Sequence, residues 1–173
     1  MENEALDNIY TRRSVRSFTA EVVSREDLTK ILRAGMAAPS AVNVQPWAFV
    51  VVTKRDVLDE LCLQLPYAKM LDQATAAIVV CGVPDKDQRY SKNYWVMDCS
   101  AATENILLAA HALGLGAVWT AVHPEQDRVD ITRTILNIPK NIIPLNVIPI
   151  GVPKNKGHIT DKFKKENIHW ETW

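Results

Sequence analysis

The segment PSAVNVQPW, residues 39–47, is the stretch from which both the fold and a candidate site can be inferred. A proline at each side restricts the backbone, and the small side chains between them let a ligand approach the main chain. Asn43 and Gln45 carry amides that both donate and accept hydrogen bonds, which suits the edge of a neutral heterocycle. The alternative is a structural turn in which these amides satisfy the loop backbone and Trp47 is an ordinary core residue.

This segment separates a predicted helix from a predicted strand. Ser24 followed by Asp27 is typical of a capped helix start, and Pro39 is expected to end the helix. The apolar residues at helical spacing between them are Leu28, Ile31, Leu32 and Met36. Residues 48–53 are apolar and largely β-branched, as in a strand buried on both faces. We therefore expect a helix, this loop and a buried strand in direct succession.

The rest of the chain mixes both kinds of element. We expect further helices at residues 4–10, 56–65, 97–113 and 124–136, and further strands at residues 76–81, 117–122 and 142–150. Pro144 and Pro149 are expected to interrupt the last strand, because proline has no N–H to donate. The helix at residues 97–113 has an apolar stripe too wide for one neighbour, which indicates a central or interface helix. No internal repeat or linker divides the chain, so the pattern predicts one α+β domain.

The C-terminal residues 152–173 differ from the core at residues 1–151. They show little periodicity, and they combine the aromatic residues Phe163, Trp170 and Trp173 with basic ones. The lysines are Lys154, Lys156, Lys162, Lys164 and Lys165. We interpret this segment as an arm, which would lie on a second copy of the chain if it does not fold back on its own domain.

Composition excludes several classes of protein. The 173 residues carry 20 basic and 20 acidic side chains, so no overall field attracts nucleic acid or an anionic membrane. The acidic start lacks the features of a secretory signal, and no apolar run reaches about 20 residues. Cys62, Cys81 and Cys99 form no C-x-x-C pair and are expected to be buried thiols of a cytoplasmic protein.

Common catalytic motifs are absent from the sequence. There is no P-loop, no H-E-x-x-H and no G-x-S-x-G, and the four histidines are not spaced as the ligands of a local metal site. The glycines at residues 114–116 lack the third glycine of a Rossmann fingerprint and follow a helix. We therefore predict no metal, no hydrolase site and no dedicated dinucleotide site.

A second candidate site is the basic cluster at residues 12–16. Arg12, Arg13 and Arg16 accompany Ser14 just after a short predicted helix. Guanidinium groups and a hydroxyl are the donors that hold a phosphate, so this cluster has the composition of an anion clamp. The alternative is a solvated charged turn or a salt bridge to another part of the chain.

Five motifs in this order resemble the FMN-dependent nitroreductase-like family. They are RRS at residues 12–14, PSAVNVQPW at 39–47, GLGAVW at 114–119, GVP at 151–153, and the tail with KF at 162–163 and IHW at 168–170. The proline-tryptophan loop is the specific element, and the set extends over nearly the whole chain. Val42 and Thr120 stand where other side chains are often seen in that family.

The resemblance implies an α+β fold with a central mixed sheet flanked by helices. It also implies a homodimer that binds FMN between its subunits and whose C-terminal arms embrace the partner. The pyrimidine edge of the flavin alternates N–H and C=O groups, which the loop amides can satisfy. By position, the residues implied to bind the cofactor are Arg12, Arg13 and Ser14 near the phosphate, Pro39, Ser40, Asn43 and Gln45 near the ring, the backbone of Trp119, Thr120 and Ala121 as a further wall, and Lys162 from the arm. Lys164 and Lys165 are alternatives to Lys162.

The activity implied is an oxidoreductase in which FMN carries the chemistry and no protein side chain acts as a nucleophile. NAD(P)H would reduce the flavin, and a small organic acceptor such as a nitroaromatic or a quinone would reoxidise it in a ping-pong sequence. The alternative is a non-catalytic flavin-binding or flavin-sensing protein on the same fold. An arm that stacks nucleic-acid bases on Trp170 and Trp173 is disfavoured by the zero net charge and by Glu166 and Glu171.

Overall fold

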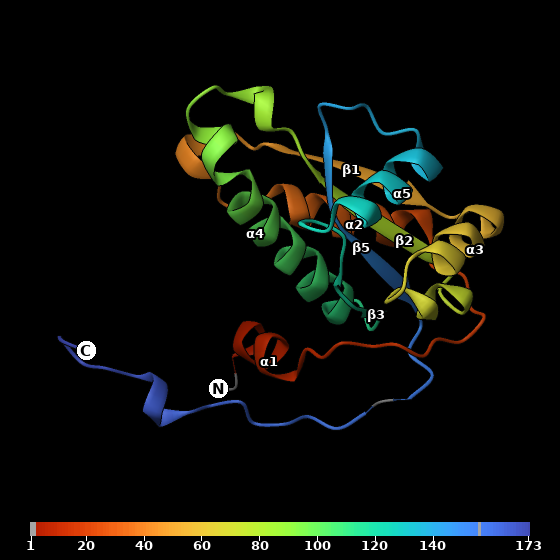
Figure 1. Cartoon of the computed structure of the whole chain (residues 1–173). Coiled ribbons are helices and arrows are strands. Elements are labelled where there is room, and N and C mark those ends of the chain that lie inside the picture. The colour runs from red at the N-terminus through yellow and green to blue at the C-terminus, as the bar shows by residue number, and fades with distance from the viewer. Residues whose placement is uncertain (1–2, 156) are drawn as a thin grey trace.

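The computed structural model describes residues 3–155 and 157–173, so Met1 and Glu2 of the acidic start and Lys156 of the predicted arm lie outside the described residues. A five-stranded sheet has the order β1-β2-β5-β3, and β4 also pairs with β5 (Figure 1). Its strands are β1 (Trp47–Val52), β2 (Ala76–Gly82), β3 (Gly116–Ala117), β4 (Thr120–Ala121) and β5 (Ile143–Gly151). The helices are α1 (Glu4–Thr11), α2 (Arg25–Met36), α3 (Arg55–Gln64), α4 (Tyr90–Ala112) and α5 (Gln126–Leu136), with 3-10 turns η1 (Ala41–Asn43), η2 (Lys69–Asp72), η3 (Pro84–Lys86) and η4 (Lys165–Asn167). The predicted α+β class is confirmed.

The sheet separates two hydrophobic cores. Alternate residues of β2 point to opposite faces, and the whole strand is buried. Val79 belongs to the core beneath α3 and α5, together with Leu61. Ile78 belongs to the core beneath α2 and α4, together with Ile31 and Ile106. The named strands pair antiparallel, and a single parallel bridge between Ser14 and Ala117 makes the sheet mixed.

The helix and strand around the proline-tryptophan loop form where the sequence predicts them. Ser24 caps α2 by accepting the N–H of Asp27 at 3.0 Å, and the helix ends at Met36. The prediction that the following strand is buried on both faces is wrong. Strand β1 forms an edge of the sheet and is mostly half-buried, with Val51 40% exposed. An apolar strand on an edge leaves a surface for another element.

Helix α4 begins seven residues before the predicted start at Met97. Its first two turns contain the polar residues Lys92 and Asn93, which mask the apolar pattern in the sequence. The structure shows why this part is helical: Ser91 and Trp95 are buried, and the Asp87 side chain accepts main-chain N–H groups at the helix start. The helix runs along one face of the sheet (Figure 1).

Strand β5 is continuous from Ile143 to Gly151, so the expected interruption of the strand itself was wrong. Its pairing is nevertheless irregular beside both prolines. The register with β2 shifts next to Pro144, because Val80 faces Asn146 whereas Cys81 faces Pro144. On the other side the predicted strand at residues 117–122 is divided into β3 and β4, where Ala117 faces Ile150 and Thr120 faces Val147. In that register Val118 faces Pro149, which has no N–H for the ladder.

Residues 152–173 leave the sheet after β5 and run beneath the body of the molecule (Figure 1). Their first part crosses the segment after α1, with the N–H of Lys154 bonded to the carbonyl of Ser17 at 3.0 Å. From residue 157 to residue 173 every side chain is exposed. The segment has the extended form expected of an arm, while its division from a core at residues 1–151 stays a prediction.

Candidate functional site

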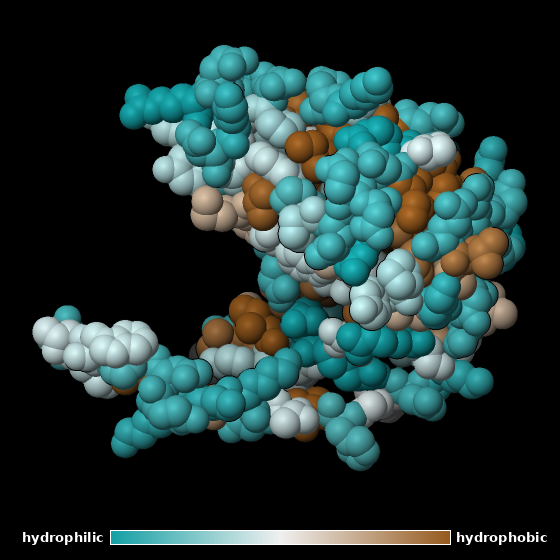
Figure 2. Space-filling model, viewed as in Figure 1, coloured by the Kyte–Doolittle hydropathy of each residue, from teal (hydrophilic) through white to brown (hydrophobic). Residues whose placement is uncertain are grey.

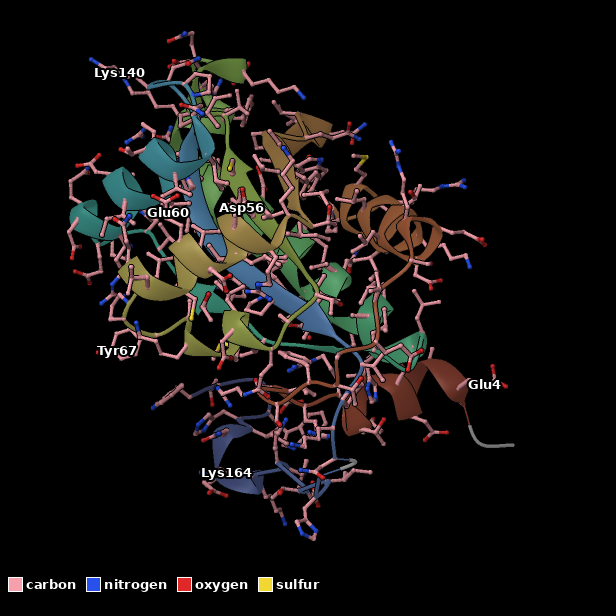
Figure 3. The ribbon with its side chains drawn as sticks, turned by 90° about the vertical axis from the view of Figure 1, so that its right-hand side faces the viewer. Glu4, Asp56, Glu60, Tyr67, Lys140 and Lys164 are labelled. Carbon is pink, nitrogen blue, oxygen red and sulfur yellow. The ribbon has the colours of Figure 1, made fainter. Side chains whose placement is uncertain are left out.

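The basic cluster and the arm form one hollow. It measures about 250 Å³ and is lined by Tyr10, Thr11, Arg12, Arg13, Ser14, His158, Ile159, Thr160 and Lys162. The structure thus brings together the four residues predicted to hold a phosphate, and three of the four are cationic. Figure 3 shows the arm, marked by Lys164, at the same end of the molecule as α1, marked by Glu4.

Two contacts fix the geometry of this hollow. The N–H of Val15 bonds to the carbonyl of Ala117 at 3.0 Å, which attaches the cluster to the sheet. The Arg13 guanidinium donates to the carbonyl of Asn155, which attaches it to the arm. The arm passes so close here that a Cβ on Gly157 would lie 2.6 Å from the Arg13 guanidinium carbon, and its φ of 65° also favours glycine. Gly157 was not singled out in the sequence.

Helix α4 supports the cluster from behind. Arg12 pairs through Nε with Glu104 Oε1 at 3.0 Å, and its side chain is only 20% exposed. Thr11 Oγ1 lies 2.8 Å from His111 Nε2. Burial, followed by the charges of Arg12 and Arg13, lowers the pKa of His111 below its ordinary value. Arg12 therefore forms the salt bridge to another part of the chain that was the alternative interpretation of this cluster. The hollow beside it is also lined by the cationic residues Arg13 and Lys162.

The proline-tryptophan loop adopts a strained backbone. Val42, Asn43 and Gln45 have φ values of 43°, 57° and 57°, a region that non-glycine residues rarely occupy. Ser40 Oγ accepts the N–H of Gln45 at 2.8 Å and so closes the turn. Pro39 is exposed at its start. Strain of this kind persists only where surrounding contacts hold it.

The two loop amides have a defined orientation. Gln45 Nε2 donates to Asn43 Oδ1 at 3.0 Å. This contact leaves Asn43 Nδ2 as a donor and Gln45 Oε1 as an acceptor, both on exposed side chains. A neighbouring donor and acceptor have the chemistry needed for an edge with alternating C=O and N–H groups, and the ring-binding role of these residues stays a prediction.

Contacts from α4 and η3 hold the loop in place. Asp98 Oδ1 accepts the N–H of Ala41 at 3.0 Å, and Asp98 is only 7% exposed. The carbonyl of Pro46 accepts the N–H of Val83 at 2.8 Å, and Lys86 Nζ donates to the carbonyl of Gln45 at 2.8 Å. Asp98 was missed in the sequence, although an acid within the apolar pattern at residues 97–113 was a signal that could have found it.

The side chains of the third predicted group differ in their exposure. Trp119 is half-buried and packs against the core beneath α2 and α4. Thr120 is buried and donates through Oγ1 to the carbonyl of Val147 at 2.6 Å, while Ala121 is exposed. Among the described residues, the side chain of Thr120 is therefore engaged inside the sheet rather than open to a ligand.

In one chain the loop and the basic cluster attach to α4 at different positions along the helix. The loop attaches at Asp98, the cluster attaches at Glu104 through Arg12, and Thr11, just before the cluster, attaches at His111. A helix advances about 1.5 Å per residue, so the attachment points of the loop and the cluster are about 9 Å apart along α4. The structure thus places the predicted cofactor residues in two groups along one helix.

The surface near these groups exposes several apolar side chains. Figure 2 shows a wide concave opening between the arm and the body, with hydrophobic atoms at its floor where Figure 1 places α1. Large apolar residues that are exposed on α1, the loop, α4 and the arm are Leu6, Ile9, Tyr10, Val42, Tyr94, Met97, Ile159, Phe163, Ile168, Trp170 and Trp173. Exposed apolar surface of this extent is typical of an interaction face.

Within residues 3–155 and 157–173, no helix is long and apolar enough to cross a membrane. The same described residues contain no cluster of three or more histidine, cysteine or acidic side chains that could hold a metal ion.

Comparison with known proteins decides the family. The model of the Nitroreductase family matches residues 9–66 and 61–152, which together make up most of the chain. The chain belongs to the nitroreductase family. The resemblance inferred from the five sequence motifs is thereby confirmed.

Relatives of this nitroreductase-family chain match it over its full length. An Archaeoglobus fulgidus protein with the provisional name NADH dehydrogenase/NAD(P)H nitroreductase is 47% identical, and the match covers 98% of this chain and 99% of the relative. A crystal structure of a Parabacteroides distasonis protein with the same provisional name has a TM-score of 0.95 at 48% identity, covering 99% of this chain and 100% of that one. A provisionally named nitroreductase of Desulfovibrio desulfuricans, solved in complex with FMN, has a TM-score of 0.84 at 32% identity, covering 100% and 99%.

Proposed function

We propose that this protein is an FMN-dependent oxidoreductase that transfers reducing equivalents from NAD(P)H to a small organic acceptor. The observation that carries the proposal is the hollow in which Arg12, Arg13, Ser14 and Lys162 converge. Membership of the nitroreductase family supports the same conclusion, as does the similarity to a relative solved with FMN.

The residues present fit the cofactor. Two guanidinium groups, a hydroxyl and an ammonium are the donor set for a phosphate, and they line one hollow. Pro39, Ser40, Asn43 and Gln45 would hold the flavin ring, with the amides of Asn43 and Gln45 directed to its pyrimidine edge. Trp119, Thr120 and Ala121 would contribute main-chain groups to a further wall.

The chemistry that FMN supplies when bound is acceptance of a hydride from NAD(P)H and its transfer to the acceptor, which we propose to be a nitroaromatic or a quinone in a ping-pong sequence. The chain's own contribution is binding and electrostatics. The cationic hollow neutralises the phosphate, and the loop amides satisfy the ring edge without adding a charge. No side chain is required as a nucleophile.

A homodimer would complete this site. In one chain no residue of the loop at residues 39–47 lines the phosphate-binding hollow, so a loop from the partner is a better match for the cluster. The exposed arm and the apolar faces of α1 and α4 give that partner a surface. A hollow of about 560 Å³ along the free edge of β1 adds a further apolar surface, lined by Val22, Val23, Arg25, Leu28, Thr29, Leu32, Val51 and Thr53.

Removal of residues 158–173 tests this arrangement. The shortened chain should lose dimerisation and retain little FMN, because both the arm and Lys162 are gone. Analytical ultracentrifugation and the flavin absorbance report the two effects separately. A shortened chain that remains a dimer with full FMN content would contradict the proposed role of the arm.

The function itself is tested on the purified holoprotein. A yellow protein that releases FMN on heating establishes the cofactor. Under anaerobic conditions, bleaching of the bound flavin by NADH or NADPH supports the oxidoreductase, whereas a flavin that stays oxidised supports a flavin-binding or flavin-sensing protein. A colourless protein that takes up no added FMN would overturn the proposal.

The cytoplasmic location also remains a proposal, and fractionation of cells would test it.

A further inference from the structure

One side of α4 contacts α1 and the first residue of the phosphate-binding cluster at three successive turns. Glu104 Oε1 forms an ion pair with Arg12 Nε at 3.0 Å. One turn later the carbonyl of Leu108 accepts from Asn8 Nδ2 at 3.1 Å. His111 follows, with its Nε2 2.8 Å from Thr11 Oγ1. Helix α1 and the first residue of the cluster are therefore attached to a helix that is buried along much of its length.

The contact to Glu104 uses a particular part of the Arg12 side chain. A guanidinium group carries one N–H on Nε and four on its two terminal nitrogens. Glu104 Oε1 lies on the Nε side of the group, and the described residues provide no hydrogen-bond partner for the terminal nitrogens of Arg12. Those nitrogens form the planar fork that binds two phosphate oxygens at once. Arg12 lines the hollow in this state.

Glu104 could act in two opposite ways. Its charge repels a phosphate, which favours removal of the carboxylate, while its contact with Nε restricts a long side chain that otherwise has large rotamer freedom. Glu104 is 48% exposed and already paired with Arg12, so solvent and the guanidinium weaken the repulsion. Arg12 is only 20% exposed, so its orientation depends on the groups around it. The orienting effect is therefore expected to be the larger.

We propose that Glu104 is a positioning residue of the phosphate site: it holds Arg12 by Nε and so presents the two terminal nitrogens of Arg12 to the phosphate. This inference rests on the proposed function, because it requires FMN as the ligand of the hollow. Glu104 itself touches neither the cofactor nor a substrate. Its effect is confined to the phosphate end and is passed through Arg12 alone.

Riboflavin separates this role from a general structural one, because it has the flavin ring and lacks the phosphate. The full-length protein is freed of FMN, and the affinities for FMN and riboflavin are measured by fluorescence titration. The variants are Glu104→Ala, Glu104→Gln and Arg12→Ala. Asp59→Asn is the matched control, because it removes a carboxylate from another arginine pair, with Arg55 Nη2 at 2.9 Å on α3.

Glu104→Ala should weaken FMN binding by about threefold to tenfold, the effect of a typical lost hydrogen bond, and leave riboflavin binding unchanged. Glu104→Gln should restore FMN binding to the wild-type level or above, because its amide oxygen still accepts from Nε and no longer repels the phosphate. Glu104→Ala added to Arg12→Ala should cause no further loss. Asp59→Asn should bind both flavins as the wild type does.

Other results would overturn the inference. FMN binding at or above the wild-type level in Glu104→Ala would mean that repulsion outweighs orientation. Equal losses for FMN and riboflavin would indicate a general structural role, and a Glu104→Gln variant as weak as Glu104→Ala would mean that the charge matters rather than the hydrogen bond. A wild-type protein that binds neither flavin would refute the proposed function itself, whereas intact FMN binding that depends on Arg12 but not on Glu104 would refute this inference alone.

Discussion

The buried carboxylate of Asp98 accepts the main-chain N–H of Ala41 at 3.0 Å, which joins the middle of α4 to the start of the strained loop. The second oxygen, Asp98 Oδ2, is buried and has no hydrogen-bond partner among the described residues. Burial of a carboxylate with so few partners costs free energy. We interpret the contact that holds the loop containing Asn43 and Gln45 as the role of this buried group.

Replacement of Asp98 is expected to release the loop. In Asp98→Ala the N–H of Ala41 loses a charged acceptor, which should lower the free energy of unfolding by about 1.5 to 3 kcal/mol. Asp98→Asn keeps an acceptor at the same place and should lose less. Urea denaturation of both variants measures the difference. Equal stability of Asp98→Ala and the wild type would show that the contact does not hold the loop.

Arg12→Ala should weaken FMN binding by about 1.5 to 3 kcal/mol, the usual effect of losing a hydrogen bond to a charged group. Arg16→Ala is the matched control, because Arg16 belongs to the same basic cluster but is exposed and does not line the hollow. Flavin content after purification and FMN titration measure the effect. Wild-type flavin content in Arg12→Ala would remove Arg12 from the site.

His111 should make stability depend on pH in a defined window. Burial and the nearby Arg12 and Arg13 lower the pKa of His111 in the fold below its ordinary value of 6.5. The unfolded chain therefore takes up the proton first, so the stability that a neutral His111 confers is complete above pH 6.5 and is lost as the pH falls toward the lower folded pKa. His111→Asn should flatten the pH dependence of unfolding in this window. An unchanged slope in that variant would contradict the assignment.

The three cysteines should differ in reactivity. Burial raises the pKa of the Cys81 and Cys99 thiols to about 12, so neither forms a thiolate at neutral pH. Cys62 is only half-buried. A thiol reagent should therefore modify one cysteine in the native protein and three in denaturant. Rapid modification of native Cys62→Ser would show that one of the buried thiols is accessible.

The local parts of the structure could be predicted from the sequence, and the non-local parts could not. Helix α2 and the loop after it follow from the cap at Ser24, the apolar spacing and the prolines, all of which act within a few residues. The edge position of β1 depends on which strands pair, and its apolar composition indicates the opposite. The break opposite Pro149 depends on a register between segments about thirty residues apart.

In the candidate site, too, the features that depend on nearby residues could be predicted and those that depend on distant residues could not. The side chains that would contact a ligand were singled out because they lie in short motifs, and the structure places Arg12, Arg13, Ser14 and Lys162 in one hollow. The side chains that orient them, Asp98 and Glu104, were not found. Both lie on α4, far in sequence from the groups they contact, and a single acid on a helix carries no local signal of its partner.

Because both groups of cofactor residues are attached to α4, the number of residues between Asp98 and Glu104 sets the distance and the angle between them. One inserted residue would increase the distance between the two attachment points by about 1.5 Å and rotate one relative to the other by about 100° around the helix axis. The side chains between them are buried or half-buried, with Cys99, Ala102 and Thr103 fully buried, so this segment is constrained in composition as well as in length. In natural variation, this stretch of helix is therefore expected to exclude insertions and deletions, the reverse of what is usual for a surface loop.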